Sequence, residues 1–263
     1  MKDNENRYFP EEIEFEDPLE QEDEIYPQKS KRFYLAIVAL IILLSFIIWS
    51  FPQIGLLFAD FSFLTQHQYL KDEEIVQNSL PAIVSIEAKR EGNLNNARGT
   101  GFNMGTEGFI LTNYHVVENS RSLKIEFPDG QVFFSDTYEQ IGDADMAVIR
   151  LGQNNLPYLS LELQERVEPR DEIIVIGNPL GYKQVSVKGQ VESYHQFRDY
   201  EILEINAPIR KGSSGSPVLN HNGKATGIVF AYRVYELEDE NQYRALAIPL
   251  KDFAADIKEV VNN

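Results

Sequence analysis

A short stretch around Ser214, KGSSGSP over residues 211–217, surrounds one serine with small residues. A serine hydroxyl is a weak nucleophile unless a base lies within hydrogen-bond reach. It also needs backbone N–H groups directed at the oxyanion that forms after attack on a carbonyl carbon. Glycines on both sides allow the tight turn that brings such groups together. Taken alone, the stretch is more typical of a Gly/Ser surface turn, so its interpretation depends on a histidine and an aspartate elsewhere.

Two upstream residues provide that context. His115 lies at the end of an apolar segment, ILTNYHVV over residues 110–117, and Asp145 immediately precedes another, MAVIRL. A lone histidine is more often structural, and an aspartate before a strand is often a turn or cap residue. Here, however, His, Asp and Ser occur in one of the known orders of catalytic triads, and each lies beside a β-type segment. The pattern therefore indicates triad-type nucleophilic catalysis, with Asp143 as a second candidate for the carboxylate.

The elements that must position these residues are short β-strands. Residues 83–250 contain short apolar segments separated by turn signals such as PDG at 128–130 and NG at 222–223. This pattern is typical of an all-β barrel or sandwich. A short helix and then a strand are predicted from Lys71 onward. A terminal amphipathic helix is predicted from apolar residues at helical spacing. These residues are Leu250, Phe253, Ala254, Ile257, Val260 and Val261.

Composition narrows the classes of function. The chain has 263 residues, of which 43% are hydrophobic, enough for one sizeable domain with extensions. Cysteine is absent, which excludes disulfides, a thiolate metal site and a cysteine nucleophile. A net charge of −17 disfavours nucleic acid as a partner, because such binding relies on Lys and Arg. His195 and His221 are not spaced as metal ligands, and triad chemistry requires no metal and no cofactor.

The first part of the chain is strongly acidic. Residues 1–28 hold eleven Asp/Glu against two basic residues. Such a segment is most simply disordered, and we predict an acidic cytoplasmic tail over residues 1–32. A role in docking a partner, or in signalling for the remainder of the chain, is a weaker alternative.

An uncharged apolar stretch follows the tail. Residues 33–51 carry no charged residue. At about 1.5 Å per residue, a helix over this stretch comes close to the ~30 Å thickness of the hydrocarbon core of a membrane. We therefore predict a transmembrane helix over residues 33–52. Lys29, Lys31 and Arg32 precede it, which favours a cytoplasmic N-terminus. Residues 53–70 are then predicted to form a juxtamembrane spacer that carries His67 at its surface.

Five motifs in order resemble the trypsin/chymotrypsin-like serine proteases, and within them the HtrA/DegP group. They are TNYHVV around His115, DADMAVIRL around Asp145, GNPLG at residues 177–181, GSSGSPV around Ser214 and LAIP at residues 246–249. The resemblance covers residues 71–263, which are predicted as the protease domain. It implies an all-β fold of two six-stranded β-barrels with a terminal helix. It also favours Asp145 over Asp143, because Asp145 directly precedes the MAV segment.

The resemblance assigns roles residue by residue. Ser214 is the expected nucleophile, His115 the base and Asp145 the carboxylate that orients the imidazole. The backbone N–H groups of Gly212 and Ser214 are the expected oxyanion hole. Two departures from the family are apparent. Ser216 replaces a glycine, a change between small residues, and we expect no PDZ domain after the terminal helix.

The resemblance also places the substrate pocket. The floor of the primary pocket falls at Pro208, with Ile209 beside it, and no carboxylate is present there to select Lys or Arg. Small or medium aliphatic side chains are expected instead. The other wall, along which an extended substrate could pair as an added strand, is expected at residues 230–233. These residues are Phe230, Ala231, Tyr232 and Arg233. Arg233 could attract acidic substrate side chains or form an ion pair with Glu236 or Glu238.

The sequence thus predicts a membrane-anchored serine endopeptidase that acts on protein or peptide substrates outside the cytoplasm. The expected location is a bacterial surface of the Gram-positive type, with a single-pass anchor. The group that the chain resembles often forms trimers, so a homotrimer is one expected assembly. The alternative is a catalytically silent module of the protease fold that binds extended peptides or senses envelope stress. The presence of all three triad residues argues against this alternative.

Overall fold

A computed structural model describes residues 31–50, 62–90, 96–236 and 241–262. The chain divides into two compact units, Met1–Ala59 and Asp60–Asn263. The predicted acidic tail lies outside the described residues, apart from the two basic residues that begin the first helix.

The first unit contributes one described helix, α1 (Lys31–Ser50). Its described apolar side chains, including Phe33, Leu35 and Phe46, are exposed. Among the residues described here, no helix is both long enough and apolar enough to cross a membrane. The structure therefore gives the transmembrane helix predicted over residues 33–52 no support.

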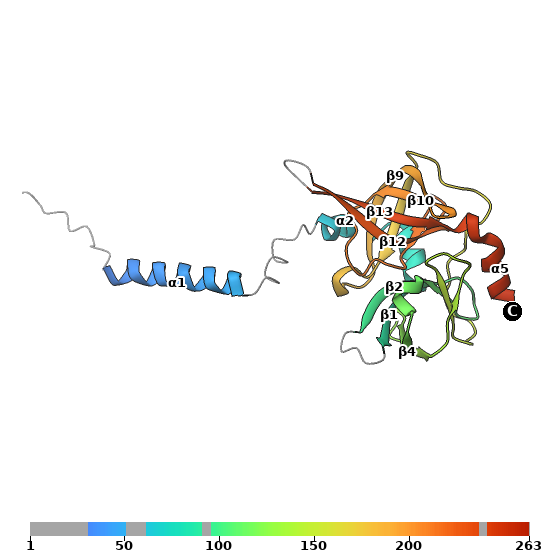
Figure 1. Ribbon diagram of the computed structural model, residues 1–263, viewed down its shortest axis with the longest axis horizontal. Coiled ribbons are helices and arrows are strands. Elements are labelled where there is room, and N and C mark those ends of the chain that lie inside the picture. Colours follow the sequence, from blue (N-terminus) through green and yellow to red (C-terminus); the bar gives the residue numbers. More distant parts are fainter. Residues whose placement is uncertain (1–30, 51–61, 91–95, 237–240, 263) are drawn as a thin grey trace, which may run out of the picture. The chain divides into compact units, whose positions relative to one another are not determined.

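The second unit is mostly β-structure, as predicted (Figure 1). Its strands are β1 (Ile83–Arg90), β2 (Ala97–Asn103), β3 (Phe109–Thr112), β4 (Ser120–Glu126), β5 (Val132–Ser135), β6 (Glu139–Gln140), β7 (Ala147–Arg150), β8 (Glu172–Gly177), β9 (Val185–Phe197), β10 (Tyr200–Asn206), β11 (Pro217–Leu219), β12 (Ala225–Glu236) and β13 (Asn241–Pro249). Its helical segments are α2 (Ser62–Leu70), α3 (Glu74–Ser79), η2 (Leu80–Ala82), α4 (Tyr114–Val117), η3 (Pro179–Gly181), η4 (Leu250–Phe253) and α5 (Ala254–Asn262).

The strands form two sheets. The first is seven-stranded, in the order β5-β4-β1-β2-β3-β7-β6. The double-barrel type of fold is as predicted, but this sheet has seven strands instead of six, and its edge strands β5 and β6 do not pair with each other among the described residues. The second sheet closes into a six-stranded barrel, β10-β13-β12-β11-β8-β9, as predicted. Burial of β-branched and aliphatic side chains fills this barrel, which is the main stabilising contribution. Its buried residues include Val175, Val187, Leu203, Ile205, Val218 and Val229.

The longest strand pairing belongs to β12 and β13, which run side by side as a hairpin (Figure 1). On its other edge, β12 pairs with β11 through Ile228. From Phe230 onward, β13 is the only strand that pairs with β12 among the described residues. The hairpin therefore presents an unpaired edge, to which an extended peptide can add as a strand.

Helix α2 falls within the predicted spacer, and it packs against β9 of the closed barrel. Phe63 is only 1% exposed and belongs to the core of that barrel. His67 is half-buried, and its Nδ1 atom lies 2.9 Å from Ser186 Oγ. The prediction of a surface histidine is thus corrected, because a buried phenylalanine one turn earlier docks the helix against the strand.

The terminal helix is confirmed. Helix α5 follows η4, and Ile257 and Val260 are buried in a core cluster with Phe253. The apolar residues of α5 therefore face the protein core, as their spacing predicts.

Candidate active site

His115 follows directly from strand β3. The buried strand Phe109–Thr112 leads into the short helix α4, where Val116 and Val117 are buried. The His115 side chain, by contrast, is 44% exposed, so the ring is accessible from solvent. Arg90, the last residue of β1, donates a hydrogen bond from Nη2 to the carbonyl oxygen of His115 at 2.6 Å. The backbone of His115 is therefore held from outside its own helix.

Asp145 holds the same histidine at two points. Its Oδ2 atom lies 2.6 Å from His115 Nδ1, and its Oδ1 atom accepts the backbone N–H of His115 at 2.8 Å. The side chain of Asn113 donates to the carbonyl oxygen of Asp145 at 2.8 Å. The contact between Asp145 Oδ2 and His115 Nδ1 favours the tautomer in which Nδ1 carries the proton and Nε2 is free to act as a base. Asp143, the second candidate, is exposed and makes no contact with His115 in the described part of the chain.

Ser214 lies in a turn that several backbone hydrogen bonds fix. The N–H of Ser213 donates to the carbonyl of Arg210 at 3.0 Å, and the N–H of Ser216 donates to the carbonyl of Ser213 at 3.0 Å. The carbonyl of Ser214 accepts the N–H of Thr100 at 2.8 Å. Gly212 and Gly215 have φ angles of +99° and +87°, a conformation that a residue with a Cβ rarely adopts. The glycines on either side of the serine are therefore required by the turn.

The structure brings the serine turn next to the histidine segment through Gly99 of β2. A Cβ added to Gly99 would lie 2.9 Å from the side chain of Val116 and 3.2 Å from the carbonyl oxygen of Ser214. Hence the residue after His115 and the backbone of Ser214 contact the same glycine. The Ser214 hydroxyl makes no hydrogen bond within the described residues. Catalytic hydrogen bonds are often long or poorly aligned in ligand-free sites and tighten when substrate binds.

Two backbone N–H groups beside the serine have no acceptor within the described residues, and they belong to Gly212 and Ser214. The carbonyl of Lys211 accepts the N–H of Leu180 at 2.8 Å. Because C=O and N–H point in opposite directions in a trans peptide, the N–H of Gly212 points away from Leu180. The N–H of Ser214 shares its peptide with the carbonyl of Ser213, which accepts the N–H of Ser216 at 3.0 Å. The orientations of both peptides are thus set by neighbouring groups.

Leu180 supports this turn at some cost. Its φ angle is +52°, a left-handed conformation that costs roughly 1–3 kcal/mol for a residue with a side chain. The neighbouring Asn178 donates its backbone N–H to Thr100 Oγ1 at 2.9 Å and its side-chain amide to the carbonyl of Val84 at 3.0 Å. The GNPLG motif is therefore a structural support for the serine turn.

Ser216, the departure from the family pattern, fits tightly. Its Oγ atom is buried and has no hydrogen-bond partner among the residues that the structure describes. A Cβ on Gly177 would lie 2.0 Å from this Oγ, so the serine occupies the space that a glycine leaves open. The substitution thus places a hydroxyl without a partner among the described residues behind the serine turn.

The predicted pocket residues differ in exposure. Ile209 is 3% exposed and belongs to the barrel core, whereas Pro208, Phe230 and Ala231 are half-buried. Tyr232 is exposed, with 44% of its surface accessible. Of these five residues, only Ile209 is fully covered, and the pocket stays a prediction.

Arg233 donates to the hydroxyl of Tyr235 at 3.1 Å. This hydrogen bond raises the pKa of Arg233 above its ordinary value. The side chains of Glu236 and Glu238, its predicted partners, lie outside the described residues.

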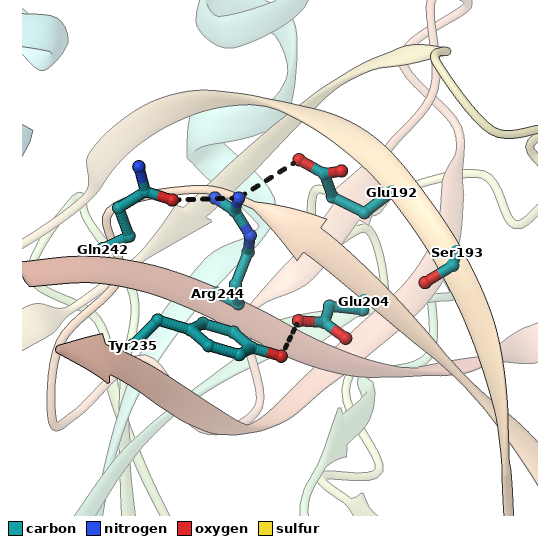
Figure 2. Close-up of a pocket in the computed structure, with 6 residues that line it drawn as sticks. All are labelled: Glu192, Ser193, Glu204, Tyr235, Gln242 and Arg244. Atoms are coloured by element: carbon teal, nitrogen blue, oxygen red, sulfur yellow. Dashed lines mark hydrogen bonds and ion pairs between the residues drawn. The ribbon is translucent and has the colours of Figure 1, made fainter. Parts of the chain in front are cut away.

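A hollow of about 300 Å³ lies elsewhere, on the outer face of strands β9, β10, β12 and β13 (Figure 2). Buried Glu204 accepts the hydroxyl of Tyr235 at 2.9 Å and lies 2.6 Å from His195 Nε2. Arg244 pairs with Glu192 at 3.5 Å. The polar groups that line the hollow therefore satisfy one another. The described residues contain no cluster of three His, Asp or Glu able to hold a metal ion.

Several residues of the site were missed by the sequence analysis. Thr100 and Asn178 lie inside the GTG and GNPLG motifs, so the motifs located them without revealing their hydrogen bonds. Arg90 and Tyr200 carry no local signal. Burial raises the pKa of the Tyr200 hydroxyl, and the nearby charge of Asp145 raises it further. Contacts of this kind depend on two distant strands meeting, which local patterns do not encode.

Comparison with known proteins agrees with this geometry. Residues 99–228 match the family model described as a trypsin-like peptidase domain. The chain is 35% identical over 138 residues to a probable periplasmic serine endoprotease, DegP-like, of Chlamydia pneumoniae, covering 50% of this chain and 28% of that protein. It is 30% identical over 179 residues to serine protease HTRA1 of Xenopus laevis, covering 62% of this chain and 39% of that protein.

The fold is also found among solved structures. The active form of the Rv3671c protease of M. tuberculosis superposes with a TM-score of 0.60 at 19% identity, covering 72% of this chain and 85% of that one. Residues 99–228 are therefore similar to a trypsin-like peptidase domain, and the curated relatives are a DegP-like endoprotease and an HTRA1 serine protease. It spans less than two fifths of the length of each of the two curated relatives named above.

Proposed function

We propose that this chain is a serine endopeptidase that hydrolyses peptide bonds through His115, Asp145 and Ser214. The observation that carries the proposal is the two-point hold of Asp145 on His115, at 2.6 Å and 2.8 Å. A carboxylate that fixes both the ring and the backbone of one histidine serves to orient a base. The turn that carries Ser214 lies nearby, because the backbone of Ser214 and the side chain of Val116, the residue after His115, both contact Gly99.

The reaction follows the acyl-transfer scheme of such triads. Ser214 Oγ attacks the carbonyl carbon of the substrate as its proton passes to His115 Nε2. The resulting oxyanion is bound by the N–H groups of Gly212 and Ser214, which have no acceptor within the described protein. Breakdown of the tetrahedral intermediate releases the amine, which takes the proton from His115. Water then attacks the acyl-enzyme with His115 as base, which releases the acid and restores Ser214.

Substrate binding is proposed along the unpaired edge of β12. An extended peptide can add to this edge as a strand from Phe230 onward, with Ala231, Tyr232 and Arg233 as its neighbours. Pro208 lines the primary pocket in this proposal, and Ile209 lies beside it in the barrel core. They supply no carboxylate, so cleavage after small or medium aliphatic residues is favoured over cleavage after Lys or Arg.

We also propose that the chain is anchored in a membrane through residues 33–52, with the protease unit outside the cytoplasm. Support comes from the uncharged stretch at residues 33–51 and from the Lys and Arg residues that precede it. The chain has no cysteine, so His221→Cys, at an exposed turn, provides a unique label. A membrane-impermeant maleimide should label this variant on intact cells, and labelling only after lysis would contradict the proposed topology.

The protease assignment is tested with the full-length chain purified in mild detergent. The wild-type chain should degrade unfolded β-casein, and Ser214→Ala should not. If both chains leave casein intact but bind an extended peptide equally well, the silent peptide-binding module is the better description. Light scattering of the same sample tests the expected trimer, which a monomeric mass would exclude.

A further inference from the structure

Helix α2 reaches the serine turn through one buried arginine. Arg210 is only 8% exposed, although buried cations are costly unless they have partners. Its guanidinium lies 3.5 Å from the centre of the Tyr243 ring and 5.7 Å from that of Phe63. Its Nη1 also donates to the carbonyl oxygen of Ile209 at 3.0 Å. The two rings come from elements far apart in the sequence, because Phe63 lies in α2 and Tyr243 lies in β13.

The backbone of the same arginine begins the catalytic turn. The carbonyl oxygen of Arg210 accepts the N–H of Ser213 at 3.0 Å. This bond spans Lys211 and Gly212, so it fixes the segment that carries the Gly212 N–H. A shift of the Arg210 backbone would therefore change the direction of that N–H. Oxyanion stabilisation is sensitive to such changes, since donors must lie about 2.7–3.1 Å from the developing charge.

Phe63 is fixed independently of Arg210. It is 1% exposed and packs in the core of the closed barrel. One turn later in α2, His67 Nδ1 accepts the N–H of Ser186 at 3.2 Å and lies 2.9 Å from its hydroxyl. The helix is thus docked at two points on β9. Arg210 meets a ring whose position is set by the barrel.

We infer that Arg210 is a positioning residue for the oxyanion turn, with Phe63 and Tyr243 as the aromatic surfaces that fix its guanidinium. The inference rests on the proposed peptidase activity of this site. A planar guanidinium stacks on an aromatic face, whereas the ammonium group of lysine cannot reproduce that geometry. Docking of α2 thereby becomes a requirement for catalysis in addition to a contribution to stability.

The test uses full-length variants and a fluorogenic peptide with valine at the cleaved position. Arg210→Lys, Tyr243→Leu and Phe63→Leu should each lower kcat by about 10- to 100-fold, less than the ~10²–10³-fold loss of an oxyanion donor itself. KM should change by less than about twofold, because the effect acts on the transition state. Tyr243→Phe keeps the ring and should retain the wild-type kcat.

Arg150→Lys is the matched control. Arg150 also lies over an aromatic ring, that of Phe109 at 5.7 Å, and donates to a carbonyl oxygen, that of Val260. It lies at the end of β7 remote from Asp145, so its variant should lose stability without losing kcat. An Arg210→Lys variant with the wild-type kcat would overturn the inference. If that variant does not fold, the Tyr243→Leu and Tyr243→Phe pair decides, and equal kcat in the two would overturn it.

A second readout separates this inference from the proposed function. In ¹⁵N-labelled chain, the amide signal of Gly212 should shift in Arg210→Lys and Tyr243→Leu and keep its position in Tyr243→Phe. An unchanged Gly212 signal in all three variants would refute the positioning role. If the wild-type chain cleaves no peptide while the Gly212 signal responds as expected, the proposed activity fails and the positioning role stands.

Discussion

Asp145 illustrates how much one side chain can determine at the residue scale. Its two oxygen atoms bind both the ring and the backbone of His115. Neutral asparagine at this position would donate an N–H toward the ring and favour the wrong tautomer. The position therefore demands a carboxylate and not merely a hydrogen-bonding group.

Asp145→Asn should accordingly lower kcat by about 10⁴-fold, since the loss seen when the tautomer is wrong is of that order. The KM for a peptide should change little. Asp143→Asn, at an exposed neighbouring position, serves as the control and should keep the wild-type kcat. Equal losses in the two variants would mean that Asp145 has no special role.

Ser216 yields a prediction about stability. Its buried hydroxyl has no partner within the described part of the chain, and an unsatisfied buried polar group costs about 1–3 kcal/mol. Ser216→Ala should therefore raise the free energy of unfolding by about 1 kcal/mol, measured by urea denaturation. Ser186→Ala is the opposite case, because that buried hydroxyl contacts His67, and its removal should destabilise the chain. Destabilisation by Ser216→Ala would imply that its hydroxyl has an acceptor.

The sequence was most informative at residues whose neighbours in the chain impose their role. The glycines around Ser214 have left-handed φ angles, and the motif itself indicated the tight turn that requires them. By contrast, Arg90 and Arg210 act through contacts with distant strands. No spacing rule relates such residues to the site, because their roles arise only when the barrel closes.

At the scale of elements, the serine turn depends on strand β2. The hydroxyl of Thr100 donates to the carbonyl of Gly212 and accepts the N–H of Asn178. One side chain thus connects the serine turn with the GNPLG segment. The alternation of β2 directs this side chain inward, where it is completely buried.

Thr100→Val should expose this dependence. Valine has a similar shape but leaves two buried polar groups unpaired, which should cost about 1–3 kcal/mol of stability and lower kcat. Thr226→Val is the control, because Thr226 is buried in β12 and makes no side-chain hydrogen bond among the described residues. The expectation fails if both variants keep full kcat.

Helix α2 should make stability depend on pH. Burial, and then the charge of Lys71, lowers the pKa of His67 below its ordinary 6.5. The folded chain therefore binds fewer protons at this site than the unfolded chain. The stabilising contribution is present above about pH 6.5 and is lost as the pH falls below that value through the folded pKa.

Urea denaturation between pH 7.5 and 5 measures this loss. His67→Asn, which keeps an acceptor and cannot titrate, should lose less stability than the wild-type chain over this range. Parallel curves for the two chains would show that His67 does not contribute. The sequence analysis predicted His67 at the surface, and this prediction was wrong because an isolated short helix carries too weak a periodic signal to predict packing.

On the scale of the whole molecule, the proposed catalytic residues adjoin strands of both sheets. His115 lies in α4 after β3 and Asp145 lies before β7 of the seven-stranded sheet, whereas Ser214 lies before β11 of the closed barrel. Asn178 connects the two, because it follows β8 and its side chain donates to the carbonyl of Val84 in β1. The overall β-fold could be predicted from motif order, whereas the seven-stranded form of the first sheet depends on short edge strands with little sequence signal.

Asn178→Ala should therefore weaken the connection between the sheets. The carbonyl of Val84 would lose a buried donor, which should lower the free energy of unfolding by about 1–3 kcal/mol. Asn220→Ala provides a comparison, because Asn220 is also buried but its Oδ1 accepts only N–H groups of its own turn. The Asn178 variant should lose more kcat than the Asn220 variant at matched stability, and an equal effect would argue against a bridging role.

Peptide mapping by mass spectrometry after treatment with a fluorophosphonate tests the central claim most directly, because only a serine activated by a base reacts readily with this reagent. The wild-type chain should carry a single phosphonyl group, located on Ser214, and His115→Ala should carry none. A phosphonyl group on another serine, or equal modification of both chains, would show that the imidazole does not activate this alcohol.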